Sequence, residues 1–343
     1  MNKTLAKISS KRVSLCEKKS VSLLLFGSFL SVITAFGPAA QAKSEFPDRP
    51  ITLVVPYAAG GGTDVVARLV AKRMGETLNK PIVVENKPGA GGGIGAGFVA
   101  RAAPNGYTLL LGTVSTQAIN PSLYKKLSYS PDKDFDPVAM LVKVPQVIVV
   151  NSKLPYQNLS ELIDAMRSSK DKINFGSQGI GGIGHLMGEM LNRQAKVETV
   201  HVPYKGAAPA LQDLVAGNIQ VLYDTPPALL PHIKSGAIRA LAVADDQRIA
   251  QLDDVPTTTE AGFPQLKAST WNAIFAPSGT PPDVVEKLNA AANTALKDAK
   301  LKEQLEAMSA TPITWSADEL GKFEQGESAK WAEIVRTSGV SLD

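Results

Sequence analysis

The sequence predicts an α/β protein with two lobes, each built on a mainly parallel sheet flanked by helices. Short apolar runs rich in β-branched residues alternate along the chain with helical patterns, which is typical of βαβ units. Residues 1–42 have the composition of a leader peptide. The remaining stretch of about 300 residues is longer than a usual single domain, which favours two lobes.

The leader has the three parts of a secretory signal peptide. Basic residues come first, an apolar segment follows over residues 21–36, and Ala40-Gln41-Ala42 is a small-x-small cleavage site. The apolar segment is shorter than the roughly twenty residues of a membrane-spanning helix, and it leads into Gly37-Pro38. We therefore expect export to the periplasm with cleavage after Ala42.

Charge and cysteine content exclude several classes of function for the exported chain. Of the 36 Lys and Arg and the 32 Asp and Glu, six and one respectively lie in the leader, which leaves 30 basic and 31 acidic side chains. Nucleic-acid binders normally show a basic excess, so we expect no nucleic-acid partner. The single cysteine, Cys16, also lies in the leader, so the rest of the chain has no thiol.

The first part of one lobe is predicted from residues 43–145. Residues 51–55 read ITLVV and predict a buried strand, and the helix expected over 64–78 places its apolar side chains on one face. Further strands are expected at 82–84, 107–111 and 138–150, and the chain crosses to the second lobe near Val144-Pro145.

The second lobe is predicted from residues 146–269. Its first helix, over 159–166, begins with Asn158 and Glu161 at the spacing of a capping box. The other elements expected here are strands at 173–175, 199–202, 219–223 and 238–243, and helices at 186–191 and 208–216.

The chain is expected to return to the first lobe over residues 270–343. The return lies near Ser269-Thr270-Trp271, and a strand follows at 272–276. Pro281-Pro282 suits the first turn of a helix over 283–296.

The first of three glycine clusters, residues 56–64, follows the first strand and opens the first helix. Glycine allows a tight backbone turn, and a helix start carries unpaired N–H donors at the positive end of its dipole. Three consecutive glycines, Gly60, Gly61 and Gly62, exceed what a simple turn requires. We therefore expect an anion-binding loop. In the second cluster, residues 89–97, close packing of a helix on the sheet is favoured over a ligand loop.

The third cluster, residues 176–185, follows another predicted strand. Gly179, Gly181 and Gly184 match the dinucleotide fingerprint G-x-G-x-x-G, and Glu198 lies where the ribose-binding acid would be. That fingerprint normally opens a Rossmann domain, however, whereas this one lies in the middle of an exported chain. A second anion-binding loop, from the other lobe, is the preferred interpretation, and a dinucleotide enzyme is an alternative.

Catalytic and metal-binding signals are weak. The three histidines, His185, His201 and His232, lie outside any G-x-S-x-G motif, so an exported hydrolase is an alternative without a supporting motif. His185 and Glu189 share a helix face but lack a third ligand. We expect no catalytic residue, no metal site and no cofactor, and a structural hydrogen bond for His185.

Two further polar residues have open interpretations. Asp224 ends a predicted strand, where open α/β sheets bind ligands. It either accepts a hydrogen bond from a ligand hydroxyl or ammonium or caps the turn before Pro226-Pro227. Lys205 either holds a distal anionic group or is a solvated surface side chain.

Six motifs in order along the chain resemble the Bug (TctC-like) family, the extracytoplasmic receptors of tripartite tricarboxylate transporters. They are VPYAAGGGTD at 55–64, VENKPGAGG at 84–92, PNGYTLL at 104–110, INPSLY at 119–124, HVPYKG at 201–206 and FAPSGTP at 275–281. The resemblance implies a Venus-flytrap fold, the two-lobed fold of periplasmic binding proteins. It also implies that loops of both lobes hold one ligand carboxylate through backbone N–H groups and waters.

Mapped onto this chain, the resemblance nominates residues of both glycine loops and their surroundings. Many members carry histidine where Gln117 stands, which leaves the distal half of the pocket open. The residues nominated by the resemblance are Tyr57, Ala58, Gly60, Gly61, Thr63, Asp64, Ser177, Gln178, Gly179 and Gly181. The predicted ligand-binding set is completed by Thr113, Ser115, Gln117, Tyr204, Lys205 and Asp224.

The function expected from these features is periplasmic capture of a dicarboxylate, tricarboxylate or aromatic acid for a tripartite transporter. The partners are then the acid and, transiently, the membrane subunits, and we expect a monomer. A ligand-sensing partner of a membrane sensor kinase would have the same pocket and is the remaining alternative.

Overall fold

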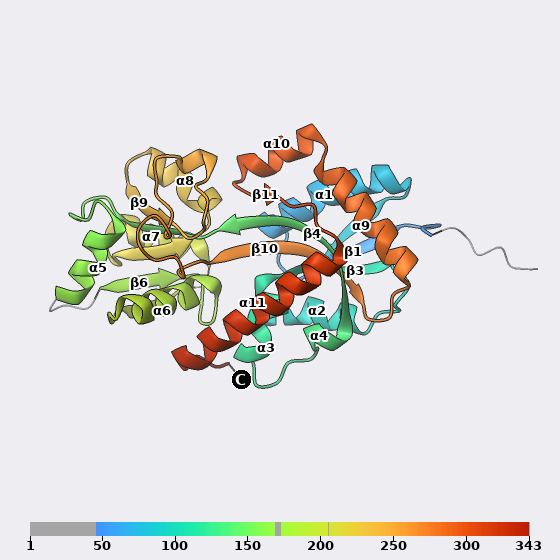
Figure 1. Ribbon diagram of the computed structural model, residues 1–343, viewed down its shortest axis with the longest axis horizontal. Coiled ribbons are helices and arrows are strands. Elements are labelled where there is room, and N and C mark those ends of the chain that lie inside the picture. The colour runs from blue at the N-terminus through green and yellow to red at the C-terminus, as the bar shows by residue number, and fades with distance from the viewer. Residues whose placement is uncertain (1–45, 169–172, 205, 343) are drawn as a thin grey trace, which may run out of the picture. The chain divides into compact units, whose positions relative to one another are not determined.

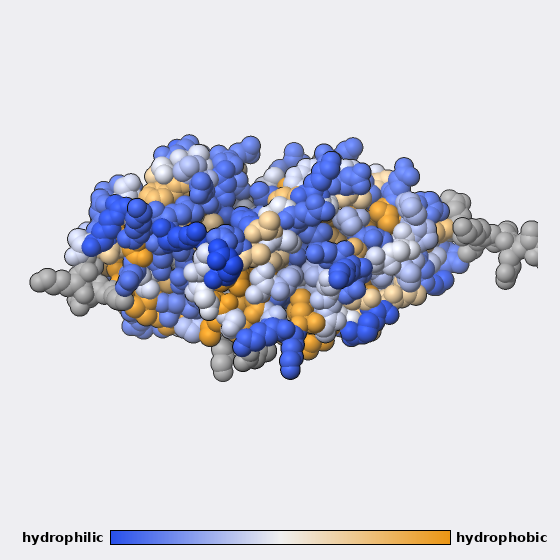
Figure 2. Space-filling model, turned by 60° about the horizontal axis from the view of Figure 1, so that its bottom comes forward, coloured by the Kyte–Doolittle hydropathy of each residue, from blue (hydrophilic) through white to orange (hydrophobic). Residues whose placement is uncertain are grey.

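The computed structural model describes residues 46–168, 173–204 and 206–342. The expected leader and its cleavage point after Ala42 lie outside these residues. Within them, no helix combines the length and the apolar character needed to cross a bilayer. On the face shown in Figure 2, hydrophilic side chains predominate and hydrophobic ones gather in small separate groups.

The first of two sheets has six strands in the order β11-β4-β10-β3-β1-β2 (Figure 1). The strands are β1 Ile51–Val55, β2 Ile82–Asn86, β3 Thr108–Thr113, β4 Phe135–Pro145, β10 Ser269–Pro277 and β11 Thr311–Pro312. β1 pairs in parallel with β2 and β3. β10 runs antiparallel to both β3 and β4, and β11 antiparallel to β4.

The second sheet has five strands in the order β7-β6-β8-β5-β9. They are β5 Val147–Asn151, β6 Asn174–Ser177, β7 Val200–Pro203, β8 Val221–Asp224 and β9 Ile238–Val243. β6 is parallel to β7 and β8, whereas β5 is antiparallel to β8 and β9.

Helices cover both faces of each sheet, and their apolar side chains form three cores. One core joins α1, α9 and α10 to the six-stranded sheet, and another joins α7 and α8 to the five-stranded sheet. The third includes α2, α11, α5 and α6 and is continuous between the two sheets. The helices are α1 Gly62–Leu78, α2 Gly93–Ala100, α3 Asn120–Leu123, α4 Pro131–Asp134, α5 Leu159–Ser168, α6 Ile183–Ala195, α7 Ala207–Ala216, α8 Pro226–Lys234, α9 Pro282–Leu296, α10 Ala299–Ala307 and α11 Ala317–Ser338, with short turns η1 Ala90–Gly92, η2 Ser115–Ile119 and η3 Ala250–Leu252.

The two-lobed α/β fold class is confirmed, with two corrections to the expected detail. Both sheets are mixed rather than mainly parallel, because the strands that lead from one sheet to the other run antiparallel to their neighbours. The single strand expected over 138–150 is two strands, β4 and β5. Pro145 has no N–H to donate, and Gln146 directs its backbone hydrogen bonds to segments between the sheets.

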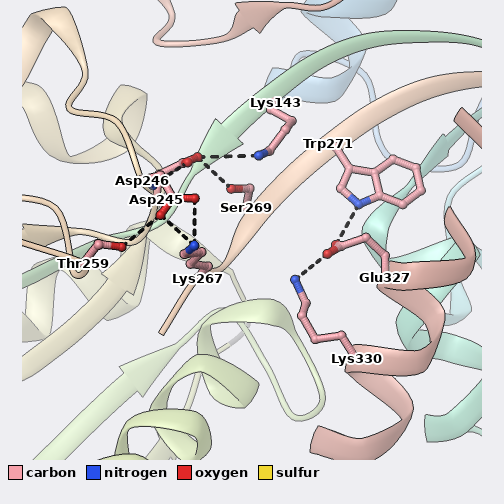
Figure 3. Close-up of polar contacts among 9 residues, drawn as sticks. All are labelled: Lys143, Asp245, Asp246, Thr259, Lys267, Ser269, Trp271, Glu327 and Lys330. Atoms are coloured by element: carbon pink, nitrogen blue, oxygen red, sulfur yellow. Dashed lines mark hydrogen bonds and ion pairs between the residues drawn. The ribbon is translucent and has the colours of Figure 1, made fainter. Parts of the chain in front are cut away.

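Three chain segments meet where the chain passes between the sheets. The Gln146 N–H donates to the Ala268 carbonyl at 2.8 Å, the Ala268 N–H to the Ala244 carbonyl at 3.1 Å, and the Ala244 N–H to the Gln146 carbonyl at 2.8 Å. These three bonds close a ring that fixes the segments to one another. Asp245 follows Ala244 in the sequence, and its carboxylate lies 3.7 Å from Lys143 Nζ. Figure 3 shows this pair.

A buried carboxylate joins the returning strand β10 to the C-terminal helix α11. Glu327 Oε2 accepts hydrogen bonds at 3.1 Å from the indole nitrogens of both Trp271 and Trp331. Glu327 also pairs with Lys330 (Figure 3). Because a buried carboxylate is stable only with such partners, these contacts hold α11 in register with the strand.

Candidate ligand site

The loop between β1 and α1 is shaped by the buried carboxylate of Asp64. Its oxygens accept hydrogen bonds at 2.9 Å from the Gly60 N–H, Arg68 Nε and Asn86 Nδ2. The hydrogen bond from Arg68 is the largest of the effects that lower the pKa of Asp64 to about 2. Asp64 is 3% exposed, so its role in this structure is to hold the loop.

The start of α1 presents N–H groups that have no partner in the described part of the chain. Gly61 is the N-cap, and α1 has no side-chain cap. The N–H groups of Gly61, Gly62 and Thr63 make no hydrogen bond to any described residue. Since Ala58, Gly60 and Gly61 are exposed, these donors are accessible to an anion.

The hydroxyl of Tyr57 connects this loop to the end of β3. Tyr57 Oη lies 2.8 Å from Thr113 Oγ1. The hydroxyl of Tyr57 also forms a hydrogen bond with the Ser115 side chain. Burial is the main effect on the pKa of Tyr57 and raises it. The tyrosine is therefore a neutral hydroxyl beside the loop.

Ser115 begins η2, a π-helical turn that the sequence did not predict. Such turns are rare and often occur at functional sites. Gln117 lies in this turn and is completely buried, and neither polar atom of its amide has a partner among the described residues. It packs beside Gly112 and Phe275, because an added Cβ on Gly112 would meet both side chains.

The second loop, between β6 and α6, uses part of its N–H groups internally. The Gly179 N–H donates to Ser177 Oγ at 3.2 Å, and the Gly181 N–H donates to His185 Nδ1 at 3.0 Å. The N–H groups of Ile180, Ile183 and Gly184 have no acceptor among the described residues. This loop therefore also offers donors, although not those of Gly179 and Gly181.

Gly181 forms a close contact with the other half of the fold. A Cβ at Gly181 would lie 2.4 Å from Leu123 Cδ2 of α3, and the φ of Gly181 is +75°. Leu123 follows β3 of the six-stranded sheet, whereas Gly181 follows β6 of the five-stranded sheet. The glycine is therefore needed both for backbone conformation and for room between the two halves.

A stacked pair of histidines, which the sequence analysis did not predict, contacts the second loop. The rings of His185 and His201 are parallel within 10°, with centroids 3.7 Å apart. Burial lowers the pKa of each to about 4. The expected structural hydrogen bond of His185 is confirmed by its contact with Gly181.

The structure also brings Ser177 and His201 together, with Oγ and Nε2 2.7 Å apart. Ser177 Oγ also lies 2.9 Å from the Gly179 carbonyl oxygen, an acceptor that competes with His201 Nε2 for the single hydroxyl proton. Ser177 is completely buried. A buried hydroxyl with a competing acceptor is poorly suited to act as a nucleophile activated by a histidine base.

Tyr204 and Asp224 lie beyond the second loop. The hydroxyl of Tyr204 is hydrogen-bonded, whereas one carboxylate oxygen of Asp224 has no described partner. Tyr204 Oη donates to Asp213 Oδ2 at 2.6 Å, and its N–H donates to the Ser177 carbonyl. Asp224 Oδ1 accepts from Gln178 Nε2 at 2.6 Å and from the Thr225 N–H at 2.7 Å, whereas Oδ2 has no described partner. Lys205 lies outside the described residues.

Metal binding finds no support in the described ranges. His185 Nε2 and Glu189 Oε1 are 3.8 Å apart, and no group of three or more potential ligands occurs in residues 46–168, 173–204 and 206–342.

Comparisons with known proteins show the family of this chain. Residues 66–340 match the family described as tripartite tricarboxylate transporter family receptor, TctC. Protein BugT of Bordetella pertussis is 37% identical over 321 residues, which cover 93% of this chain and 98% of BugT.

Two similar solved structures carry acids. An R. palustris protein with adipate is 35% identical with a TM-score of 0.77, covering 86% of this chain and 99% of that one. MatC from Rhodopseudomonas palustris, with bound malate, is 38% identical with a TM-score of 0.73, covering 84% and 100%. Because the family match and these relatives extend over most of the chain, this protein belongs to the tripartite tricarboxylate transporter receptor (TctC) family.

Proposed function

We propose that this protein is a periplasmic receptor that captures a dicarboxylate, tricarboxylate or aromatic acid for the membrane subunits of a tripartite transporter. The observation that carries the proposal is the set of N–H groups of Gly61, Gly62 and Thr63 at the start of α1, which have no partner in the described part of the chain. The adipate and malate of the two solved relatives support a carboxylate ligand. The leader supports export with cleavage after Ala42, and the receptor acts as a monomer.

The proposed site lies between two lobes, residues 43–145 with 270–343 and residues 146–269. Donors from α1 face the ligand carboxylate on one side, and the loop between β6 and α6 faces it on the other. Neither loop contains Lys or Arg at its donor positions, so the attraction comes from oriented N–H groups and the helix dipole. Tyr57, Ala58, Gly60, Asp64, Thr113, Ser115, Gln117, Ser177, Gln178, Gly179, Gly181, Tyr204, Lys205 and Asp224 complete the proposed site.

The protein binds the acid without turning it over. The N–H groups stabilise a carboxylate as it stands, and the hydroxyl of Ser177 in the Ser177–His201 pair is completely buried and has the Gly179 carbonyl as a competing acceptor.

The proposal is tested by titrating adipate, L-malate and their diamides into the protein in a calorimeter. Loss of the negative charge forfeits charge-assisted hydrogen bonds, so each diamide should bind at least about tenfold more weakly than its acid. Equal affinity of acid and amide would exclude a binding site for the ligand carboxylate.

A matched pair of glycine variants tests whether the loop between β1 and α1 binds the ligand carboxylate. Gly61 has a φ of −76°, and its added Cβ would meet only the Ala58 carbonyl at 3.8 Å, so Gly61→Ala should fold normally. We expect it to weaken acid binding about tenfold by obstructing the anion's approach. Gly326→Ala on α11, where nothing lies within 4 Å, is the control and should bind normally. Full affinity in Gly61→Ala would remove this loop from the site.

A further inference from the structure

Asp224 and Gln178 lie side by side at the edge of the sheet where the proposed site opens. Asp224 is the last residue of β8, and Gln178 directly follows β6. These strands are adjacent and parallel, with Gly176 opposite Leu222. Both residues therefore lie at strand carboxyl ends, where open α/β sheets bind ligands.

The carboxylate of Asp224 is incompletely satisfied. The residue is 1% exposed, its Oδ1 accepts hydrogen bonds from Gln178 and Thr225, and its Oδ2 has no partner among the described residues. No Lys, Arg or His in the described ranges forms an ion pair with it. A buried carboxylate oxygen without a partner is costly, so such an oxygen at a ligand site favours a ligand that supplies a donor.

Gln178 covers Asp224 with a neutral donor. Its amide Nε2 lies 2.6 Å from Asp224 Oδ1, yet the residue itself is exposed on the loop. The hydrogen bond from Gln178 therefore holds the carboxylate through Oδ1 and leaves Oδ2 for a second donor.

We propose that Asp224 recognises a hydrogen-bond donor on the ligand, a hydroxyl or an ammonium group, which pairs with its Oδ2 while Gln178 stays bonded to Oδ1. This inference rests on the proposed function, and it narrows the ligand class to hydroxy acids or amino acids that carry a carboxylate. An unsubstituted acid would bring only acceptors to Asp224 and leave its Oδ2 unpaired.

The test compares acids that differ only by one donor. Succinate is paired with L-malate and L-aspartate, and glutarate with L-2-hydroxyglutarate and L-glutamate, in calorimetric titrations at constant pH. We expect the donor-bearing member of a pair to bind about tenfold more tightly than the unsubstituted acid, since it makes one additional hydrogen bond to a charged group. The hydroxy and amino arms then distinguish the two kinds of donor.

Three variants assign the preference to Asp224. Asp224→Asn keeps the shape and one acceptor oxygen, and it should lose most of the preference while still binding the unsubstituted acid. Gln178→Ala should keep the ratio of affinities within each pair even where the affinity for every acid falls, and Asp164→Asn, at an exposed aspartate on α5, should change neither the ratio nor the affinities.

The possible failures are distinguishable. Equal affinity within every pair for the wild-type protein, or an unchanged preference in Asp224→Asn, would overturn the role of Asp224 but not the carboxylate receptor. If none of the acids bound to the wild-type protein, both the receptor and the donor subsite would be wrong.

Discussion

A single carboxylate organises the first glycine loop at the residue scale. Asp64 accepts the hydrogen bond of the Gly60 N–H. The next donors, at Gly61, Gly62 and Thr63, have no acceptor among the described residues and can bind a ligand. The positive charge of Arg68, which pairs with Asp64, also offsets the negative charge of this carboxylate near the proposed anion site. A buried Asp in this position is therefore compatible with carboxylate binding.

We expect Asp64→Asn to lower the free energy of unfolding by roughly 1–2 kcal/mol at pH 7, because an amide cannot accept all three hydrogen bonds. The pKa of Asp64 is about 2 in the folded protein and 3.8 ordinarily, so the unfolded chain binds more protons in acid. The stabilisation from Asp64 is present above pH 4 and is lost as the pH falls from about 4 to about 2.

Urea unfolding followed by circular dichroism at pH 7, 4 and 3 measures this effect. The difference between wild type and Asp64→Asn should shrink in acid. Asp164→Asn, which removes an exposed i,i+3 pair with Arg167, is the control and should change little. A constant difference at all three pH values would contradict the role of Asp64.

Residue types in the glycine loops were predictable, but their hydrogen bonds were not. The glycine and acid at the start of α1 follow from helix-start chemistry, as does the strand before them. Which acceptor takes which N–H depends on side chains distant in sequence, such as Asn86 for Asp64 and His201 for Ser177. Spacing along one chain carries no information on such contacts.

Elements were predicted best where the apolar pattern is regular. The strands expected at 51–55 and 238–243 are confirmed as β1 and β9. The helix expected at 186–191 is longer, Ile183–Ala195, because Gly188 weakens the pattern but provides room for Phe175: an added Cβ would lie 2.3 Å from that ring. The π-turn η2 has no distinct sequence pattern and was missed.

Where β7 packs against β6 and α6, two buried histidines are expected to make the stability of the fold depend on pH. His201 lies opposite Phe175 in the β6–β7 register and stacks on His185 of α6. Both histidines have a pKa of about 4, lowered from 6.5 by burial, so the folded protein resists their protonation. A proton on His185 Nδ1 would also break its hydrogen bond from Gly181.

We expect stability to fall as the pH drops from about 6.5 to about 4, since the unfolded chain binds protons there and the folded chain does not. His185→Gln and His201→Gln should flatten this dependence, whereas His232→Gln on α8 should preserve it. The measurement is the free energy of unfolding in urea between pH 7.5 and pH 4.5. The same slope in all four proteins would mean that other groups cause it.

The two halves of the molecule are connected by a few contacts between segments far apart in sequence. Besides the ring of backbone bonds at Gln146, Ala244 and Ala268, the Arg193 side chain of α6 donates to Thr337 Oγ1 of α11 at 2.8 Å. Leu123 packs on Gly181 at the loop itself. The composition of each segment indicates a turn or a helix end and does not identify its partner.

The Leu123–Gly181 contact gives the sharpest test at this scale. Gly181→Ala places a methyl group 2.4 Å from Leu123 Cδ2, so the buried Leu123 side chain must move, and we expect this to disturb the packing of α3 on the second loop and the convergence of the donors on one carboxylate. Gly179→Ala is the matched control, because Gly179 also has a positive φ, +147°, but its nearest neighbour is the Tyr204 carbonyl at 3.7 Å. We expect Gly181→Ala to weaken L-malate or adipate binding about tenfold more than Gly179→Ala, as measured by calorimetry.

Adding Leu123→Ala to Gly181→Ala removes the steric conflict but not the backbone strain, so it should restore part of the affinity. Equal losses in the two glycine variants, without recovery in the double variant, would show that binding does not depend on this contact.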